Sequence, residues 1–352
     1  MRKQLLVVMA LAVALVVACG PTPAPQVITV VSTVEVEKVV TAVPTVAPPA
    51  KEFKLAAILP GVITDADYNT LGYLGAVEVE KTYGIKMAYS ENVPVPDVER
   101  VMREYIADGY NIIFTHGDQF SSQTANVAKE YAEVFFIAEH DTPMEDHPAN
   151  LWVIDRNFHV PFYAIGATAA KATKTGKIGY LGGQTLSFSY AEVHAVQQAL
   201  KDLGSNAQFT YVWVGDFNDP TKARELADAM IGDGIDVIMA SLNLGVYGVF
   251  EAVKKAPSPV LVTAKYTDKS FFAPQNYVTA ALYDYKKPLV EIVGKIMNGE
   301  TKGIYPLGFD TGVAVQLPLQ NVPEQVNTEV TQIVADILSG KIEVIEDTSE
   351  IK

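Results

Sequence analysis

Two stretches in different halves of the chain decide the fold: residues 107–113 read ADGYNII, and residues 231–238 read IGDGIDVI. In each stretch a glycine separates the end of a helical segment from a short apolar run, and glycine commonly ends helices. The same supersecondary unit therefore occurs twice. This repetition predicts two similar lobes.

Strands and helices alternate from residue 53 onward. The predicted strands are mostly apolar on both faces, as strands covered by helices on both sides must be; they are 53–59, 86–89, 111–115, 134–138, 177–181, 209–214, 236–240, 260–264, 278–282 and 312–317. Segments with helical periodicity lie between or after them: 71–83, 96–108, 122–131, 160–174, 189–203, 220–232, 245–255, 285–298 and 323–339. This order predicts an α/β protein with doubly wound parallel sheets. Ligands of such sheets bind beyond the carboxyl ends of strands, so two lobes predict a cleft between them.

Composition excludes several classes of function. The 352 residues include 27 Lys and Arg and 41 Asp and Glu, and the net charge of −14 argues against a nucleic-acid binder. Five histidines and one cysteine argue against a multi-ligand zinc or iron–sulfur site. No sequence motif of a serine hydrolase, a zinc protease or a phosphate-binding loop is present. We therefore predict no catalytic residue, no metal and no cofactor, and we expect a monomer.

The N-terminus has the pattern of a processed segment. Arg2 and Lys3 precede an apolar run over residues 5–18, which is shorter than the ~20 residues needed to span a bilayer. Residues 1–18 are therefore predicted to be a signal peptide. Ala18 and Cys19 resemble the lipobox of bacterial lipoproteins, which implies cleavage before Cys19 and its lipidation. The alternative is a small buried thiol.

Removal of residues 1–18 leaves 25 basic and 41 acidic residues, since Arg2 and Lys3 are lost, and 25 − 41 gives a mature charge of −16. A protein with this negative charge does not bind an anionic bilayer by itself. The lipid on Cys19 would therefore hold the protein at the membrane. The predicted location is extracytoplasmic, anchored to the cell membrane.

A segment rich in Pro, Thr and Val follows Cys19. Prolines near both of its ends oppose a helix, and residues 19–51 are predicted to form a disordered tether with a lipidated first residue. At ~3.3 Å per residue its greatest reach is about 100 Å. An edge strand of the main domain is the alternative.

Candidate ligand-binding residues lie in loops that follow predicted strands. Aromatic rings with a few hydrogen-bonding groups suit a flat heterocycle with polar edges. Capping of helices and turns is the alternative role of the Asp and Asn residues. The candidates are Asp65, Tyr68, Asn69, Phe120, Phe217, Asn243, Tyr266, Asp268 and Asp284.

Residues 52–340 resemble the basic membrane protein family of lipoprotein substrate-binding proteins, which includes purine nucleoside receptors of ABC importers. The matching stretches are 65–69, 110–115, 174–179, 182–183, 217–220, 232–238, 248–252 and 272–274. The resemblance implies a type I periplasmic-binding-protein fold, in which three crossover strands join two lobes. We expect crossovers near 155–159, 283–286 and 309–312. The expected N-terminal lobe is 52–157 plus 283–309, and the expected C-terminal lobe is 158–282 plus 310–352.

The resemblance also implies a ligand class. Tyr68 matches the family aromatic that stacks on the purine, and Phe217 matches an aromatic loop residue of the second lobe. Nucleoside-binding members carry a ribose-binding Asp where this chain has Tyr266, and a Lys where it has Tyr283; Asp268 is retained. These departures favour a free purine base over a nucleoside.

The leading hypothesis is a lipid-anchored protein that delivers a small heterocycle to the permease subunits of an ABC transporter. A ligand-sensing ectodomain that signals to a membrane partner is one alternative, and a surface enzyme acting on nucleosides is the other.

Overall fold

The computed structural model describes residues 52–142, 144 and 146–351. The predicted signal peptide, Cys19 and the predicted tether lie outside the described residues. Among the helices of the described part, none is long and apolar enough to cross a membrane.

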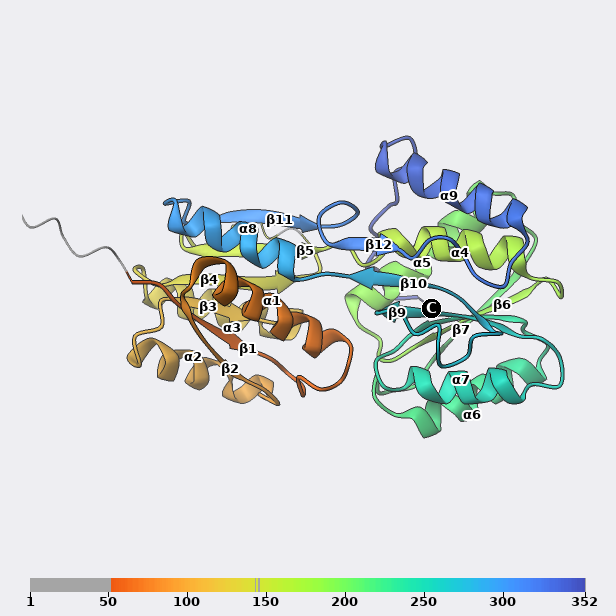
Figure 1. Ribbon diagram of the computed structural model, residues 1–352, viewed down its shortest axis with the longest axis horizontal. Helices are drawn as coiled ribbons and strands as arrows, with labels where there is room; N and C mark the ends of the chain where they lie inside the picture. Colours follow the sequence, from red (N-terminus) through yellow and green to blue (C-terminus); the bar gives the residue numbers. More distant parts are fainter. Residues whose placement is uncertain (1–51, 143, 145, 352) are drawn as a thin grey trace, which may run out of the picture. The chain divides into compact units, whose positions relative to one another are not determined.

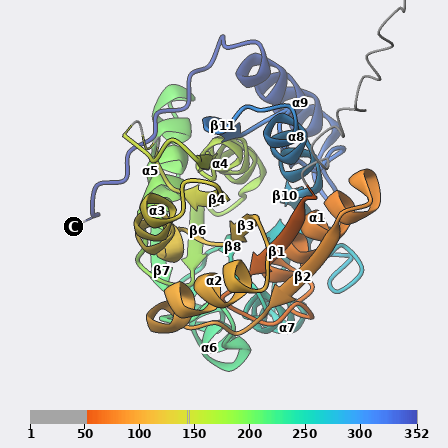
Figure 2. The same ribbon diagram turned by 90° about the vertical axis from the view of Figure 1, so that its left-hand side faces the viewer.

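The first six-stranded sheet, called the N-lobe sheet, has the order β11-β5-β4-β3-β1-β2, and all its neighbouring strands are parallel. Helices α2 and α3 cover one face, and α1 and α8 pack together on the other (Figure 2). Its elements are β1 (Lys54–Ile58), α1 (Tyr68–Tyr83), β2 (Lys86–Ser90), α2 (Val98–Ala107), β3 (Ile112–Thr115), α3 (Ser121–Glu130), β4 (Phe135–His140), β5 (Leu151–Arg156), α8 (Lys286–Met297) and β11 (Gly303–Leu307). Short 3-10 helices at Val95–Asp97 and Asp118–Phe120 precede α2 and α3.

The second six-stranded sheet, called the C-lobe sheet, has the order β12-β10-β9-β8-β6-β7, and only β12 is antiparallel to its neighbour. Helices α6 and α7 pack together on one side, and α4 packs against both α5 and α9 (Figure 1). Its elements are α4 (Val160–Ala172), β6 (Lys177–Gly182), α5 (Ser187–Asp202), β7 (Gln208–Trp213), α6 (Pro220–Gly232), β8 (Val237–Ser241), α7 (Val246–Lys255), β9 (Leu261–Tyr266), β10 (Tyr277–Tyr283), β12 (Val313–Val315) and α9 (Glu324–Leu338).

The repeated unit has the same geometry in both lobes. Gly109 has φ 83° and Gly234 has φ 85°, a left-handed conformation that glycine adopts without strain. Each glycine N–H donates to a carbonyl three residues earlier, in Ile106 and Ile231 respectively, at 3.0 Å. The glycines thus end α2 and α6 in the same way and direct the chain into β3 and β8, as the sequence predicts.

The chain passes between the two sheets three times. The connections are residues 157–159 from β5 to α4, residues 284–285 from β10 to α8, and residues 308–312 from β11 to β12. They fall at the three places where the family resemblance predicts crossovers. The fold is therefore the predicted two-lobed α/β architecture of periplasmic binding proteins.

Two strands were missing from the sequence prediction. All six residues of β5 are buried, but the charged Asp155 and Arg156 at its end conceal an otherwise apolar pattern. The short β11 contains Gly303 and Pro306, which both weaken strand signals. Proline is tolerated there because β11 is at the edge of its sheet.

Candidate binding site

A cavity of about 590 Å³ has walls from both lobes. Its lining residues lie at the carboxyl ends of strands, or in the loops and helix starts that follow them; the strands are β1, β2, β3, β4 and β5 of one sheet and β6, β7, β8 and β9 of the other. Aromatic, charged and amide groups predominate: Tyr68, Phe188, Phe217 and Tyr266; Asp118, Asp141, Arg156 and Asp216; Asn69, Gln119, Gln184, Asn218 and Asn243. This is the position where open α/β sheets bind ligands.

The loop before α1 is fixed by Asp65. Its carboxylate accepts hydrogen bonds from the backbone N–H groups of Asp67, Asn69 and Thr70, at 2.9 to 3.0 Å. It also accepts from the side-chain amide of Asn69 at 2.8 Å, and that amide's oxygen accepts from Gly61 N at 3.0 Å. Burial alone would raise the pKa of Asp65, but hydrogen bonds led by that from Thr70 lower it below its ordinary value. Asp65 and Asn69 therefore hold the loop that presents Tyr68.

The Tyr68 side chain lines the cavity. One face of its ring stacks on His116, with ring centroids 3.9 Å apart and planes inclined by 25°. His116 in turn packs so tightly on α1 that a Cβ at Gly72 would lie 2.7 Å from its ring. The Tyr68 hydroxyl donates to Glu139 Oε2 at 2.7 Å and accepts from Arg156 Nη1 at 2.9 Å. The ring is thus held rigidly by both stacking and hydrogen bonds.

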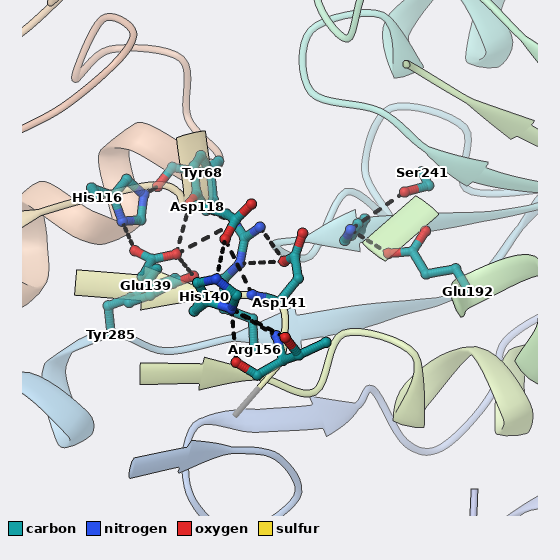
Figure 3. A network of polar contacts seen from close by, with 12 residues as sticks. Tyr68, His116, Asp118, Glu139, His140, Asp141, Arg156, Glu192, Ser241 and Tyr285 are labelled. Carbon is teal, nitrogen blue, oxygen red and sulfur yellow. Dashed lines mark hydrogen bonds and ion pairs between the residues drawn. The ribbon is translucent and has the colours of Figure 1, made fainter. Parts of the chain in front are cut away.

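Tyr68, His116, Glu139, Asp141 and Arg156 form what we call the charged cluster (Figure 3). Glu139 is fully buried; its Oε1 contacts His116 Nδ1, and its Oε2 also accepts from Tyr285 at 3.0 Å. His116 Nε2 lies 2.8 Å from the Tyr68 carbonyl oxygen, so both ring nitrogens of His116 face oxygen atoms. Burial would raise the pKa of Glu139, but His116 and then Arg156 lower it.

Arg156 is the cationic side chain of the charged cluster that lines the cavity. Its Nε donates to Asp141 Oδ1 at 2.9 Å, and Nη2 donates to the same oxygen. Burial would lower the pKa of Arg156, but the neighbouring Asp141, Tyr68 and Glu139 raise it well above the ordinary value. The guanidinium is therefore a permanent cation in the cavity wall.

The C-lobe contributes aromatic planes. Phe217 stacks on Phe188 with centroids 6.0 Å apart and planes inclined by 22°. Phe217 lies over Gly183, where a Cβ would be 2.1 Å from its ring, so only glycine permits this placement. Tyr266 is a non-glycine residue with φ 74°, a strained conformation of the kind that occurs at ligand sites. The Oδ1 of Asn243 is buried and accepts no hydrogen bond from the described residues.

A second buried cation lies behind these rings. Lys265 Nζ pairs with Glu192 Oε1 at 2.5 Å, both side chains are fully buried, and the Glu192 carboxylate also accepts from Tyr180 at 2.7 Å. The ammonium lies 4.4 Å from the centroid of Phe188 and 5.0 Å from that of Tyr266. Burial raises the pKa of Glu192 and lowers that of Lys265, against the attraction between them.

One ion pair joins the two lobes beside the cavity. Asp67, in the loop before α1, accepts from Lys269 Nζ at 2.5 Å and from Thr267 Oγ1 at 3.0 Å, both in the loop after β9. Asp67 and Lys269 are almost completely buried. Burial, opposed mainly by Lys269, raises the pKa of Asp67 to about 6. The contact therefore joins the loop before α1 to the loop after β9.

Comparison with known proteins identifies the family. The profile of the Bmp family, described as ABC transporter substrate-binding protein PnrA-like, matches residues 53–348. The chain belongs to this family. It is 27% identical over 302 residues to basic membrane protein A2 of Borrelia garinii subsp. bavariensis, covering 82% of this chain and 87% of that protein. It is 24% identical over 262 residues to a purine-binding protein of Brucella abortus, covering 73% and 72%.

Solved structures agree with the fold. A solute-binding protein of an ABC transporter system from Aeropyrum pernix K1 superposes with a TM-score of 0.73 at 18% identity, covering 84% of this chain and 94% of that chain. A similar protein from Conexibacter woesei gives 0.67 at 21% identity, with coverage of 84% and 99%. This Bmp-family chain is thus an ABC transporter substrate-binding protein. Proteins of this class work outside the cytoplasm and bind their ligand without transforming it.

The structure brings some of the predicted site residues to the cavity and leaves others outside it. Tyr68, Asn69, Phe217, Asn243 and Tyr266 line the cavity of this Bmp-family protein, and Asp65 lies directly behind its wall. The remaining three have other surroundings.

Phe120 is fully buried in the hydrophobic core between the N-lobe sheet and helices α2 and α3. Asp268 and Asp284 are exposed and cap backbone N–H groups of Ser270 and Lys286, at 2.8 and 2.9 Å. They therefore fit the helix- and turn-capping alternative.

Several residues of the site escaped the sequence analysis. Arg156 is the last residue of the strand that was not predicted, although a charged pair after the apolar residues 151–154 was a usable signal. Phe188 lies just outside the predicted helix 189–203 and was assigned no role, whereas the structure places it in the first turn of α5. Asp118, Gln119 and Asp141 were not among the candidates, although they follow the ends of β3 and β4 and the same strand-end rule would have identified them. Within the described residues, no group of three or more His, Cys, Asp or Glu side chains could hold a metal ion.

Proposed function

We propose that this protein captures a purine base in the interlobe cavity and delivers it, as a lipid-anchored monomer, to the permease subunits of an ABC importer. The observation that carries the proposal is the cavity lining, in which Tyr68 of one lobe and Phe188, Phe217 and Tyr266 of the other accompany amide and carboxylate groups. Flat rings with polar edges match such a lining. The purine-binding relative from Brucella abortus supports the same ligand class.

The two lobes would supply opposite faces of the binding site. Tyr68 is held from behind by His116, and Phe217 is held by its stack on Phe188, so both rings are ordered before a ligand arrives. Pre-ordering lowers the entropy lost on binding. Closure would follow a hinge motion at the three crossovers, and the Asp67–Lys269 pair would form as the lobes meet.

The cavity favours a neutral or cationic ligand. Three carboxylates, those of Asp118, Asp141 and Asp216, line it together with one cation, Arg156. A phosphorylated ligand would bring negative charge against this excess, so a nucleotide is a poor ligand on electrostatic grounds.

A free base is expected to bind more tightly than its nucleoside. Tyr266 stands where the resemblance places an Asp for the ribose hydroxyls, and Tyr283, behind it, stands in place of a Lys. Hydroxyl groups buried without partners cost about 1–3 kcal/mol each, which is tenfold or more in affinity.

Calorimetry with adenine, adenosine and AMP tests this function. We expect adenine to bind at least tenfold more tightly than adenosine, and AMP to bind most weakly. Tyr68→Ala should abolish binding, while Phe271→Ala, a matched change at an aromatic side chain that is 71% exposed and outside the cavity, should leave it unchanged. Equal or tighter binding of adenosine would refute the preference, and absence of binding by any purine, hypoxanthine included, would refute the purine site.

The membrane anchor has a separate test. Cys19→Ser should move the protein from the membrane to the soluble fraction of cells without changing its thermal unfolding, because only the lipid would hold so acidic a chain to a bilayer. Continued membrane association of a processed Ser variant would exclude lipidation at Cys19.

A further inference from the structure

Arg156 has hydrogen-bonding capacity that the described residues do not use. A guanidinium carries five N–H donors. Nε and one N–H of Nη2 are directed to Asp141 Oδ1, and one N–H of Nη1 is directed to the Tyr68 hydroxyl at 2.9 Å. The other acceptor near Nη1 is Glu139 Oε2 at 3.5 Å, the outer limit of a hydrogen bond. The end of the guanidinium, formed by Nη1 and Nη2, therefore keeps donors for a ligand.

The position of Arg156 directs these donors to the cavity. Its side chain lines the cavity, yet it is only 5% exposed, so an unused N–H has little access to bulk water once the lobes close. The faces of the guanidinium are also covered, since its central carbon lies 4.8 Å from the centroid of Phe158 and 5.4 Å from that of Phe188. Because buried N–H groups need acceptors, the ligand must supply one.

Asp141 offers the complementary acceptor beside Arg156. Both bonds from Arg156 go to Oδ1, and Oδ2 accepts no hydrogen bond from the described residues. Asp141 also lines the cavity. Arg156 and Asp141 form one ion pair (Figure 3) and both line the cavity, so one ligand can reach the unused N–H donors and the free oxygen together. A ligand edge that satisfies both must present an acceptor and an N–H donor on neighbouring atoms.

Two common ring edges have that pattern. The Nη1 and Nη2 end of Arg156, which we call the guanidinium fork, binds one of these edges better than the other. A lactam presents a carbonyl oxygen next to a ring N–H, and an amidine presents a ring nitrogen next to an amino group. A carbonyl oxygen has two lone pairs and accepts from both Nη1 and Nη2, whereas a ring nitrogen has one and leaves an N–H without a partner. A charged donor left unpaired in a closed cavity weakens binding by about tenfold or more.

We propose that Arg156 and Asp141 select ligands with a neutral ring lactam, with the carbonyl bound by the guanidinium fork and the ring N–H bound by Asp141 Oδ2. This inference rests on the proposed function, because it takes the same cavity as the ligand site. It extends that function by naming the chemical group that distinguishes one ring from another. Under it, a 6-oxopurine is a better ligand than a 6-aminopurine.

The test compares ligands that differ only at this edge. Calorimetry with hypoxanthine and adenine measures the preference, and 1-methylhypoxanthine removes the N–H that Asp141 would accept. We expect hypoxanthine to bind at least tenfold more tightly than adenine and than 1-methylhypoxanthine. Equal affinities, or tighter binding of adenine, would overturn the inference without any protein variant.

Arg156→Lys tests the residue itself. Lysine keeps the charge beside Asp141 but has no planar fork, so the ratio of hypoxanthine to adenine affinity should fall to within about twofold. Arg100→Lys, the same change at an exposed residue of α2, should keep the full ratio. Thermal unfolding of each variant establishes that it is folded. A folded Arg156→Lys variant with the full ratio would show that Arg156 does not select the lactam.

A second ligand pair separates this inference from the purine proposal. Pyrimidin-4-one and 4-aminopyrimidine carry the same two edges without a purine ring. If no purine binds but pyrimidin-4-one binds more tightly than its amino counterpart, the purine proposal fails and the lactam inference stands. If neither pair shows a preference for the lactam, the inference fails.

Discussion

The two sides of the cavity each contain a buried cation paired with a carboxylate, but they use it differently. On the N-lobe side, Arg156 and Asp141 reach the cavity and have unused hydrogen-bonding atoms. On the C-lobe side, Lys265 and Glu192 are fully buried, do not line the cavity, and lie beside the rings of Phe188 and Tyr266, which do line it. The N-lobe ion pair thus offers directional polar contacts to a ligand, whereas the C-lobe ion pair lies behind aromatic planes.

This difference divides the work of recognition. Stacking on an aromatic plane depends little on which substituents the ligand ring carries, because every heterocycle has a π face. Hydrogen bonds to a fixed donor and acceptor depend strongly on them. We therefore expect changes to the C-lobe rings and to the Lys265–Glu192 pair to alter affinity or stability uniformly, and changes to Arg156 or Asp141 to alter the choice among ligands.

The largest effect, on stability, is expected from the buried Lys265–Glu192 ion pair. Lys265→Met should lower the free energy of unfolding by about 3–5 kcal/mol, because it leaves the Glu192 charge buried without its cation. Urea unfolding measures the change. Lys254→Met, which removes a half-exposed partner of Glu251, should cost less than about 1 kcal/mol.

The double variant Lys265→Met/Glu192→Leu provides the control for this mechanism. It removes both charges, so it should recover most of the lost stability. If Lys265→Met were no less stable than Lys254→Met, the pair would not be buried in solution, and the contrast between the two sides would be lost.

The next largest effect should come from the Asp67–Lys269 pair, which joins the two sides. Asp67→Asn leaves the Lys269 ammonium buried in the closed form but solvated in the open form. The cost should therefore appear as an affinity loss of about 2–5 kcal/mol for hypoxanthine and adenine alike, with little change in stability. Calorimetry measures the affinities.

Asp67→Asn/Lys269→Met should restore most of that affinity, because neither lobe then buries an unpaired charge on closure. A single variant that binds as well as the parent would show that the lobes close on ligand without burying this pair.

Sequence reasoning located the cavity better than it located the contacts. The rule that ligands bind beyond strand ends brought Tyr68, Phe217, Asn243 and Tyr266 together, because parallel sheets fix where those loops gather. The rule did not distinguish residues that can contact a ligand from residues that hold a loop in place. Asp65 is of the second kind, because its carboxylate accepts hydrogen bonds from backbone N–H groups of its own loop. Which of these roles an Asp takes depends on loop geometry that the sequence does not specify.

The sequence did not reveal the roles of residues that depend on partners far away in the chain. Arg156 acquires its role from Asp141, Tyr68 and Glu139, which lie on separate strands and loops. A charged residue at the end of an unpredicted strand gave no indication of these partners. The fold was more predictable because alternation, glycine stops and apolar runs are local signals, repeated in both lobes.

The smallest effect is expected from the aromatic plane itself. Phe217→Ala removes a ring from the C-lobe side, and that ring stacks on Phe188, which is not a member of the charged cluster. Loss of one stacking partner should weaken binding by about 1–3 kcal/mol. Because stacking does not distinguish a lactam from an amidine, the binding of hypoxanthine and of adenine should weaken by the same factor, and the ratio of their affinities should stay as in the parent.

Calorimetry with both ligands measures the loss of affinity and the ratio of affinities together, and Phe271→Ala is the matched aromatic control outside the cavity. A changed ratio in Phe217→Ala would mean that the C-lobe side also takes part in selecting the ligand edge, and the division between planes on one side and polar contacts on the other would be wrong.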